Sequence, residues 1–267
     1  MSKSSLEHKI VFTSVAPIYS NPSFSSEMIN QALFWDALAI MDVEDNWFQI
    51  KQKDGYLGWV HSFYLTDSTV YDNNSKFFNN CKNWYFVKDR FLEISIDSVN
   101  KFFISFGSSI PCIVANNKFM IIFPNGEKYL VSKESLISNI EIPTIENVIN
   151  ISHTLLNIPY LWGGRSSFGF DCSALIQIIL SILNIPFPRD TKDQIKYNNM
   201  KLVKSDYCSG DLIFFSKDGK VNHVGIFINK NEYLHSSGCV KINSLNDDDC
   251  NYDDYLFNLL DSVYRII

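Results

Sequence analysis

The segment at residues 172–183 constrains the fold more than any other part of this chain. Its apolar side chains surround a helical axis almost completely, because they stand at positions 174, 175, 176, 178, 179, 180, 182 and 183. A helix that is apolar on all sides belongs in the interior of a domain. Asn184, Ile185 and Pro186 follow, and proline cannot continue a helix. We therefore expect a buried central helix that ends near Leu183.

The sequence around this helix predicts a domain of the α+β class over residues 141–267. Thr144 can cap an earlier helix over residues 145–156, which Pro159 brings to an end. Three β-type segments follow the central helix, at 211–215, 223–228 and 233–236. Helices first and an antiparallel sheet afterwards is the order of an α+β domain.

Residues 1–68 predict a small antiparallel β-barrel. Short apolar runs at 10–12, 38–41 and 47–50 alternate with turn residues. Asp54 and Gly55 form a turn signal before a strand in which Gly58 lets Trp59 pack closely as a core aromatic.

Residues 69–140 repeat this β character less regularly. Apolar runs occur at 102–106 and 119–123, and Pro124-Asn125-Gly126-Glu127 precedes a third run at 129–131. Asn-Gly between apolar runs is a strong hairpin signal. We interpret the region as a second, diverged barrel, although a β insertion of another kind would give the same pattern. A chain of 267 residues is long enough for three such units.

Composition excludes two classes of partner. Charged residues make up 19% of the chain and the formal net charge is -6, so no basic surface for nucleic acid or an anionic membrane is expected. No run of about eighteen apolar residues occurs, so we expect no membrane span.

The cysteines and the N-terminus bear on the compartment. The six cysteines show no CxxC pair and no regular spacing, which indicates free thiols rather than a disulfide framework. Residues 1–9 contain no apolar core of a signal peptide. These features predict a cytoplasmic protein, or an exported one if a signal peptide has been removed.

Cys172 stands at the first position of the predicted central helix. The positive end of the helix dipole and unpaired backbone N–H groups surround a side chain there. Both favour the thiolate, which attacks carbonyl groups, and the same N–H groups can stabilise an oxyanion. A lone cysteine at a helix start is more often a small buried residue, so the interpretation depends on a base nearby.

Two histidines on successive predicted strands supply the candidate base and its partner. His223 begins one strand, with Gly225 on the same face leaving room beside the imidazole, and His235 lies on the next strand. If the strands pair as a hairpin, His235 can accept a hydrogen bond from the ring N–H of His223. Cys172, His223 and His235 then form a Cys-His-His triad. Zinc binds the same residue types, but these lack clustered ligand spacing, and we expect no metal and no cofactor.

Five motifs, taken in order, resemble the NlpC/P60 family of papain-like cell-wall peptidases. They are Trp162-Gly163-Gly164, Asp171-Cys172-Ser173, Gly210-Asp211-Leu212-Ile213-Phe214-Phe215, His223-Val224-Gly225-Ile226 and Leu234-His235. The piece Gly55-Tyr56-Leu57-Gly58-Trp59 resembles part of a bacterial SH3-like domain. Two small SH3-like β-barrels before such a catalytic domain, with Pro188-Arg189-Asp190-Thr191 after the central helix, are similar to the YkfC-type branch.

The resemblance implies an activity and a set of site residues. Members of that branch cleave the bond between γ-D-glutamate and the diamino acid of peptidoglycan stem peptides, and they favour fragments with a free L-alanine N-terminus. The resemblance implies Cys172, His223 and His235 as the triad and Asp171 as the partner of the L-alanine amine. It also implies side chains around the γ-D-glutamyl unit, namely Ser173, Tyr160, Trp162 and Thr191.

The branch also brings an acidic residue and a tyrosine from the first SH3-like domain into the cleft. Glu27 and Tyr56 are our candidates, with Glu44, Asp54 and Tyr64 as rivals. Peptidoglycan stem peptides or muropeptides are thus the expected partners. Whether the diamino acid is diaminopimelate or lysine stays open. Two other functions stay open as well, a wall-binding protein with an inert catalytic domain and an acyltransferase built on the papain-like core.

Overall fold

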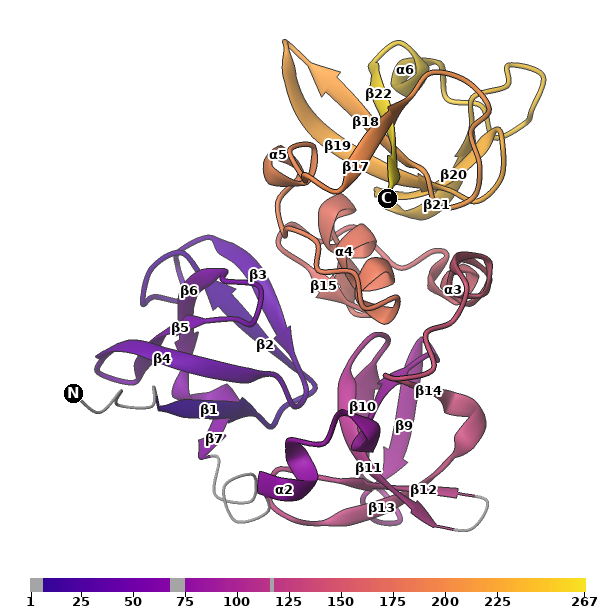
Figure 1. The fold of residues 1–267 in the computed structure, drawn as a ribbon. Helices are drawn as coiled ribbons and strands as arrows, with labels where there is room; N and C mark the ends of the chain where they lie inside the picture. The colour runs from indigo at the N-terminus through magenta and orange to yellow at the C-terminus, as the bar shows by residue number, and fades with distance from the viewer. Residues whose placement is uncertain (1–6, 68–74, 116–117) are drawn as a thin grey trace. The chain divides into compact units, whose positions relative to one another are not determined.

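The computed structural model describes residues 7–67, 75–115 and 118–267, which fall into two compact units. The first unit comprises Met1–Ile142 together with Arg165–Ser167, and the second comprises Pro143–Gly164 and Phe168–Ile267 (Figure 1). The predicted boundary between residues 68 and 69 lies outside the described residues.

The N-terminal part of the first unit is an antiparallel sheet of seven strands (Figure 1). In sheet order the strands are β3 (Met28–Leu33), β2 (Val15–Tyr19), β6 (Leu57–His61), β5 (Trp47–Lys51), β4 (Ala37–Glu44), β1 (His8–Val11) and β7 (Leu65–Asp67). A short 3-10 helix, η1 (Ser62–Tyr64), precedes β7. The predicted runs at 10–12, 38–41 and 47–50 coincide with β1, β4 and β5, so the expected β pattern is confirmed.

Gly58 allows a close contact with Ile18 rather than the predicted close packing of Trp59. A Cβ atom at this position would lie 2.4 Å from Cγ2 of Ile18 on the neighbouring strand, so β2 and β6 approach closely only with glycine here. Along β6, Gly58 and Val60 are buried whereas Trp59 is half-buried. The expectation that Trp59 is a core aromatic is wrong, because the alternation of the strand gives the core positions to its two neighbours.

The later residues of the first unit form a second β region. Its five-stranded sheet has the order β13 (Lys128–Ser132), β12 (Lys118–Ile122), β11 (Ser109–Ala115), β8 (Trp84–Val87) and β14 (Leu136–Ser138), and β9 (Phe91–Ser95) pairs with β10 (Lys101–Ser105). Short helical turns are α2 (Ser75–Phe78), η2 (Cys81–Asn83) and η3 (Lys133–Ser135). The predicted hairpin is confirmed, since β12 and β13 pair antiparallel around Asn125-Gly126 and Gly126 has a φ of 89°.

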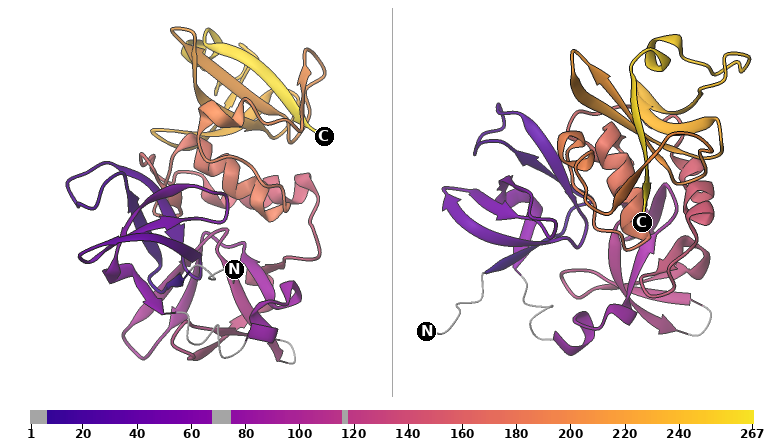
Figure 2. Two further views of the ribbon diagram at one scale, coloured as in Figure 1. Left: turned by 60° about the vertical axis from the view of Figure 1, so that its left-hand side comes forward. Right: turned by 45° about the horizontal axis from the view of Figure 1, so that its top comes forward.

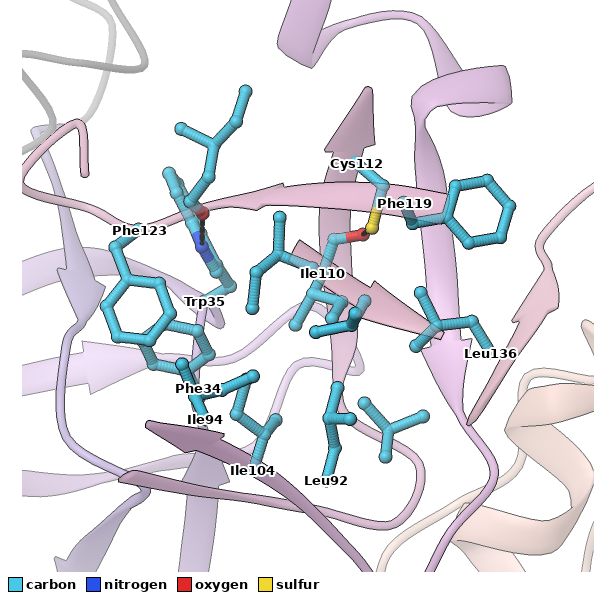
Figure 3. Close-up of a cluster of buried hydrophobic side chains, with 14 of the residues drawn as sticks. Phe34, Trp35, Leu92, Ile94, Ile104, Ile110, Cys112, Phe119, Phe123 and Leu136 are labelled. Carbon is cyan, nitrogen blue, oxygen red and sulfur yellow. Dashed lines mark hydrogen bonds between the residues drawn. The ribbon is translucent and has the colours of Figure 1, made fainter. Parts of the chain in front are cut away.

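The two β regions share one hydrophobic cluster (Figure 3). Phe34, beyond the end of β3, lies with its ring centroid 5.0 Å from that of Phe102 and 4.8 Å from that of Phe123. The indole Nε1–H of Trp35 donates to the Ile122 carbonyl at 2.7 Å, which satisfies a buried polar group (Figure 3). The shared cluster explains why residues on both sides of the predicted 68–69 boundary belong to one compact unit.

The second unit contains the predicted central helix. Helix α4 (Cys172–Ile182) is buried along its length and lies against β19 (Lys220–Phe227) and β20 (Glu232–Ser237) (Figures 1 and 2). The earlier helix, α3 (Ile145–Ser152), begins at Thr144, whose side chain accepts a hydrogen bond from the backbone N–H of Asn147. The Thr144 cap and the central helix agree with the prediction, whereas α3 ends at Ser152 and the rest of the predicted 145–156 range contains the 3-10 helix η4 (His153–Leu155).

The sheet of this unit has six strands rather than the three predicted. Its order is β17 (Met200–Val203), β22 (Leu260–Ile266), β18 (Leu212–Lys217), β19, β20 and β21 (Cys239–Ser244). The other elements are η4 (His153–Leu155), β16 (Gly169–Phe170), α5 (Thr191–Gln194) and α6 (Asp254–Phe257), and β15 (Arg165–Ser166) belongs to the first unit. The predicted strands are β18, β19 and β20. The three strands that were not predicted are β17 and β21, which lie at the sheet edges, and β22, which lies between β17 and β18; polar residues interrupt the apolar pattern in all three.

Two further expectations concern cysteines and membrane spans. Cys112, Cys172, Cys208, Cys239 and Cys250 are free thiols, as predicted, and the side chain of Cys81 lies outside the described residues. The helices of the described ranges are all too short or too polar to span a bilayer.

Candidate active site

The local backbone fixes Cys172 at the start of α4. The Asp171 carboxylate caps the helix by accepting a hydrogen bond from the Ala174 N–H at 2.8 Å. The Asp171 N–H in turn donates to the Gly164 carbonyl at 2.9 Å. A Cβ atom at Gly164 would lie 2.4 Å from the Gly169 carbonyl oxygen, so this support needs glycine. The glycine motif therefore positions Asp171, the residue that caps the helix beginning at Cys172.

The thiol of Cys172 lies among hydrogen-bonding groups. Its Sγ is 3.9 Å from Oγ1 of Thr191, and the backbone N–H groups of Ser173 and Val224 also hydrogen-bond to the sulfur. Val224 follows His223 in β19, so the sulfur lies beside the strand that carries the candidate base.

Opposing effects act on the pKa of the Cys172 thiol. Burial, followed by the Asp171 carboxylate, raises the pKa of the thiol to about 11. The hydrogen bonds from Thr191, Val224 and Ser173 lower the pKa, but by less. The hydrogen-bonding groups at the helix start favour the thiolate, as expected, but desolvation outweighs them. Cys172 therefore rests as a thiol near pH 7.

The two histidines meet on adjacent strands, as predicted. His235 of β20 lies opposite Gly225 of β19, one pleat from His223. Nε2 of His223 lies 2.8 Å from Nδ1 of His235. Burial, followed by the neighbouring His235, lowers the pKa of His223 to about 3, and burial lowers the pKa of His235 to about 4. Both rings are neutral near pH 7, so one ring nitrogen of each histidine holds a lone pair.

A third polar side chain continues this pair. Nε2 of His235 lies 2.7 Å from Oδ1 of Asn243, on β21, and Nδ2 of Asn243 donates to the Asn251 carbonyl at 2.6 Å. Sequence reasoning missed Asn243. Since β21 itself was not predicted, nothing placed this asparagine beside His235.

A buried ion pair, also missed, lies behind the cysteine. Arg189 donates to both carboxylate oxygens of Asp171, from Nη1 to Oδ1 at 3.0 Å and from Nη2 to Oδ2 at 2.5 Å. The same Nη1 donates to the Ser173 hydroxyl at 2.9 Å. Arg189 is 4% exposed and Asp171 is 7% exposed, so water contributes little to either charge. The only sign of this ion pair in the sequence was Arg189 itself, a charged residue that follows Phe187 and Pro188 and precedes Asp190 and Thr191.

This pair predicts that Asp171 is essential for stability. Asp171→Ala removes both the carboxylate that pairs with the buried Arg189 and the helix cap, so we expect the free energy of unfolding to fall by about 3–5 kcal/mol in urea denaturation. Asp190→Ala is the matched control, because Asp190 pairs with Lys192, whose side chain is 72% exposed, at 3.5 Å. That change should cost less than about 1 kcal/mol. Equal losses in the two variants would contradict a buried, paired role for Asp171.

The other residues predicted to bind the substrate differ in how deeply they are buried. Tyr160 lies near the thiol, and burial, followed by the charges of Cys172 and Asp171, raises its pKa to about 12, so its hydroxyl stays protonated. Thr191 is buried beside Cys172. Trp162 is 63% exposed, which rules out a core role.

Glu27 and Tyr56 belong to the first unit, so their place in the cleft stays a prediction. The Tyr56 hydroxyl donates to the Ile29 carbonyl at 3.5 Å, which places the ring near the strand that follows Glu27. Their rivals Glu44, Asp54 and Tyr64 lie in the same unit.

Comparison with known proteins gives two domain matches. Residues 157–256 match the NlpC/P60 family, and residues 18–63 match the bacterial dipeptidyl-peptidase SH3 domain. The γ-D-glutamyl-L-lysine dipeptidyl-peptidase of Bacillus cereus is 26% identical over 233 residues, which covers 79% of this chain and 68% of the relative. The enzyme of the same name from Bacillus subtilis is 26% identical over 219 residues, which covers 77% of this chain and 71% of the relative.

The fold also matches a solved structure. The crystal structure of an NlpC/P60 family protein from Bacillus cereus superimposes with a TM-score of 0.81 at 21% identity, covering 97% of this chain and 99% of that chain. The matched residues 157–256 contain Cys172 and both histidines, so the site described above lies inside the family domain. The chain therefore contains an NlpC/P60 domain and an N-terminal bacterial SH3 domain, which supports a cysteine peptidase.

Proposed function

We propose that this protein hydrolyses the bond between γ-D-glutamate and the diamino acid in peptidoglycan stem peptides. The observation that carries the proposal is the 2.8 Å contact between His223 and His235 on strands beside the Cys172 thiol. Two relatives named γ-D-glutamyl-L-lysine dipeptidyl-peptidases support the substrate class. In this proposal Cys172 is the nucleophile, His223 the base and His235 the residue that orients the base.

The neutral resting states determine the order of proton transfers. His223 takes the proton of the thiol as the sulfur attacks the γ-glutamyl carbonyl, and a backbone N–H at the start of α4 binds the developing oxyanion. The imidazolium then gives this proton to the departing amine of the diamino acid, leaving a thioester. Water attacks the thioester with His223 again as base, which releases the γ-glutamyl product and restores the thiol.

A preference for a free L-alanine amine requires a carboxylate whose negative charge is not already offset by another cation. Arg189 already pairs with both oxygens of Asp171, which offsets the negative charge of that carboxylate. The ammonium group therefore depends more on an acidic residue from the SH3 domain, for which Glu27 is the candidate. A cytoplasmic location, where freed wall fragments are recycled, is part of the same proposal.

The substrate preference is tested with paired tripeptides. We expect cleavage of L-Ala-γ-D-Glu-diaminopimelate and little cleavage of its N-acetylated form or of intact sacculi, measured as release of L-Ala-γ-D-Glu by chromatography. The lysine tripeptide, run in parallel, identifies the diamino acid. Glu27→Gln should reduce the ratio of the rate on the free tripeptide to the rate on the acetylated tripeptide by about tenfold to a hundredfold. Charge-assisted hydrogen bonds contribute about 1.5–3 kcal/mol, which corresponds to a factor of this size.

Glu44→Gln is the matched control and should keep the wild-type preference. Equal rates on the free and acetylated tripeptides would replace this proposal with a general wall hydrolase. Transfer of the acyl group to an amine without net hydrolysis would indicate an acyltransferase. Binding without any turnover would indicate an inert wall-binding protein.

We also infer that the second β region is a diverged copy of the SH3-like barrel. In both regions a glycine closes the turn between the paired strands, with the Gly55 N–H bonded to Gln52 and the Gly126 N–H bonded to Phe123, at 2.9 and 2.8 Å. Each pair is followed by a three-residue 3-10 helix and a three-residue strand, η1 with β7 and η3 with β14. This repeated order supports an internal duplication of the fold.

A further inference from the structure

The hydrogen bonds of Asn243 determine which of its side-chain atoms faces His235. The Asn251 carbonyl can only accept, and it receives the Ser244 N–H at 3.1 Å as well as Nδ2 of Asn243 at 2.6 Å. Nδ2 therefore has to point toward Asn251. Oδ1 of Asn243 consequently points toward Nε2 of His235, at 2.7 Å.

The direction of this hydrogen bond determines the tautomers of both histidines. Oδ1 is an acceptor, so Nε2 of His235 carries the proton and Nδ1 of His235 holds a lone pair. That lone pair faces Nε2 of His223 at 2.8 Å, so Nε2 of His223 carries its proton too. The remaining nitrogen of His223, Nδ1, then holds the lone pair that a base needs.

We propose that Asn243 is a positioning residue, which selects the Nε2–H tautomer of His235 and thereby keeps Nδ1 of His223 as the free base for Cys172. The role in catalysis rests on the function proposed above, whereas the tautomers are properties of the free protein. Asn243 is 8% exposed and His235 is fully buried, so water does not take over this hydrogen bond.

The alternative tautomer explains what loss of Asn243 does. If His235 carried its proton on Nδ1, that N–H would face the Nε2–H of His223, and two donors cannot bond. His223 would then shift its own proton to Nδ1 so that Nε2 could accept. In that state Nδ1 of His223 donates instead of accepting, so His223 cannot take the proton of Cys172.

The tautomers are measured in the free protein by long-range 1H–15N correlation NMR with 15N-labelled histidine near pH 7. We expect both His223 and His235 in the Nε2–H form in the wild type, with the signals assigned from His→Gln variants. Asn243→Leu, similar in volume but without an acceptor, should populate the Nδ1–H form. Asn243→Asp keeps an acceptor and should keep the Nε2–H form of both rings.

Activity on the tripeptide is the second measurement. Asn243→Leu should lower kcat by about tenfold to a hundredfold at nearly constant KM, the size of effect found for groups that orient metal-ligating histidines. Asn243→Asp should recover most of the lost rate. Ser244→Ala is the matched control, because its hydroxyl bonds the Asp249 carboxylate at 2.6 Å on the same strand end, and it should keep the wild-type kcat and tautomers.

The outcomes separate this inference from the proposed function. An Nδ1–H form of His235 in the wild type, or unchanged tautomers in a folded Asn243→Leu protein, would overturn it. A loss of rate that Asn243→Asp does not restore, with tautomers unchanged, would also overturn it and leave a purely structural role. The expected tautomers in a protein that cleaves no tripeptide would support the positioning role and overturn the proposed function.

Discussion

Cys172→Ala is expected to lower hydrolysis of the tripeptide by about 10⁴-fold or more, because loss of a nucleophile removes the covalent route entirely. The fold should survive, since the change deletes one sulfur atom and costs about 1–2 kcal/mol at a buried site. Product release measured by chromatography gives the rate, and thermal unfolding followed by circular dichroism tests the fold.

Cys208→Ala provides the matched control for this result. Cys208 is another free thiol of the same unit, but it is exposed and lies near the Asp211 carboxylate rather than near a histidine. Its replacement should leave the rate unchanged. Undiminished turnover by Cys172→Ala would end the assignment of Cys172 as the nucleophile.

The parts of the site that could be predicted were those with a local signal. The apolar pattern identified α4 as a buried helix, and its predicted start at Cys172 agrees with the structure. Strand alternation placed His223, Gly225 and His235 on one face, and the observed register confirms their contact. Each inference used only spacing within one element or between two neighbouring ones.

The parts that could not be predicted depend on residues distant in the sequence. Arg189 pairs with Asp171 across eighteen positions, and no periodic pattern connects the two. Asn243 reaches His235 only because β21 pairs with β20, and that pairing requires a strand whose apolar pattern is weak at the sheet edge. The contact between Ile18 and Gly58 likewise depends on β2 lying beside β6.

The net effect of the surroundings on the protonation of Cys172 could not be predicted for a different reason. A helix start favours a thiolate, and that effect can be inferred from position alone. Desolvation depends on everything packed around the sulfur, and it raises the pKa of Cys172 while it lowers the pKa of His223. Both shifts favour the neutral pair. Attack and proton transfer are therefore expected to be coupled, which makes the orientation of His223 important to the rate.

The two histidines are expected to differ in how much their loss costs. His223→Ala should lower kcat by about 10²–10⁴-fold, the usual contribution of a general base, because no other group then takes the thiol proton. His235→Ala should cost less, about tenfold to a hundredfold, since His223 remains present but is poorly oriented. His153→Ala is the control, because its ring bonds the Ile149 carbonyl at 3.0 Å on α3 and has no role in the proposed reaction. Rates are compared at saturating tripeptide and only between variants of equal thermal stability, because His235 is fully buried and its removal also leaves a cavity. If His235→Ala were the more damaging change under those conditions, His235 would be the base and His223 the residue that orients it.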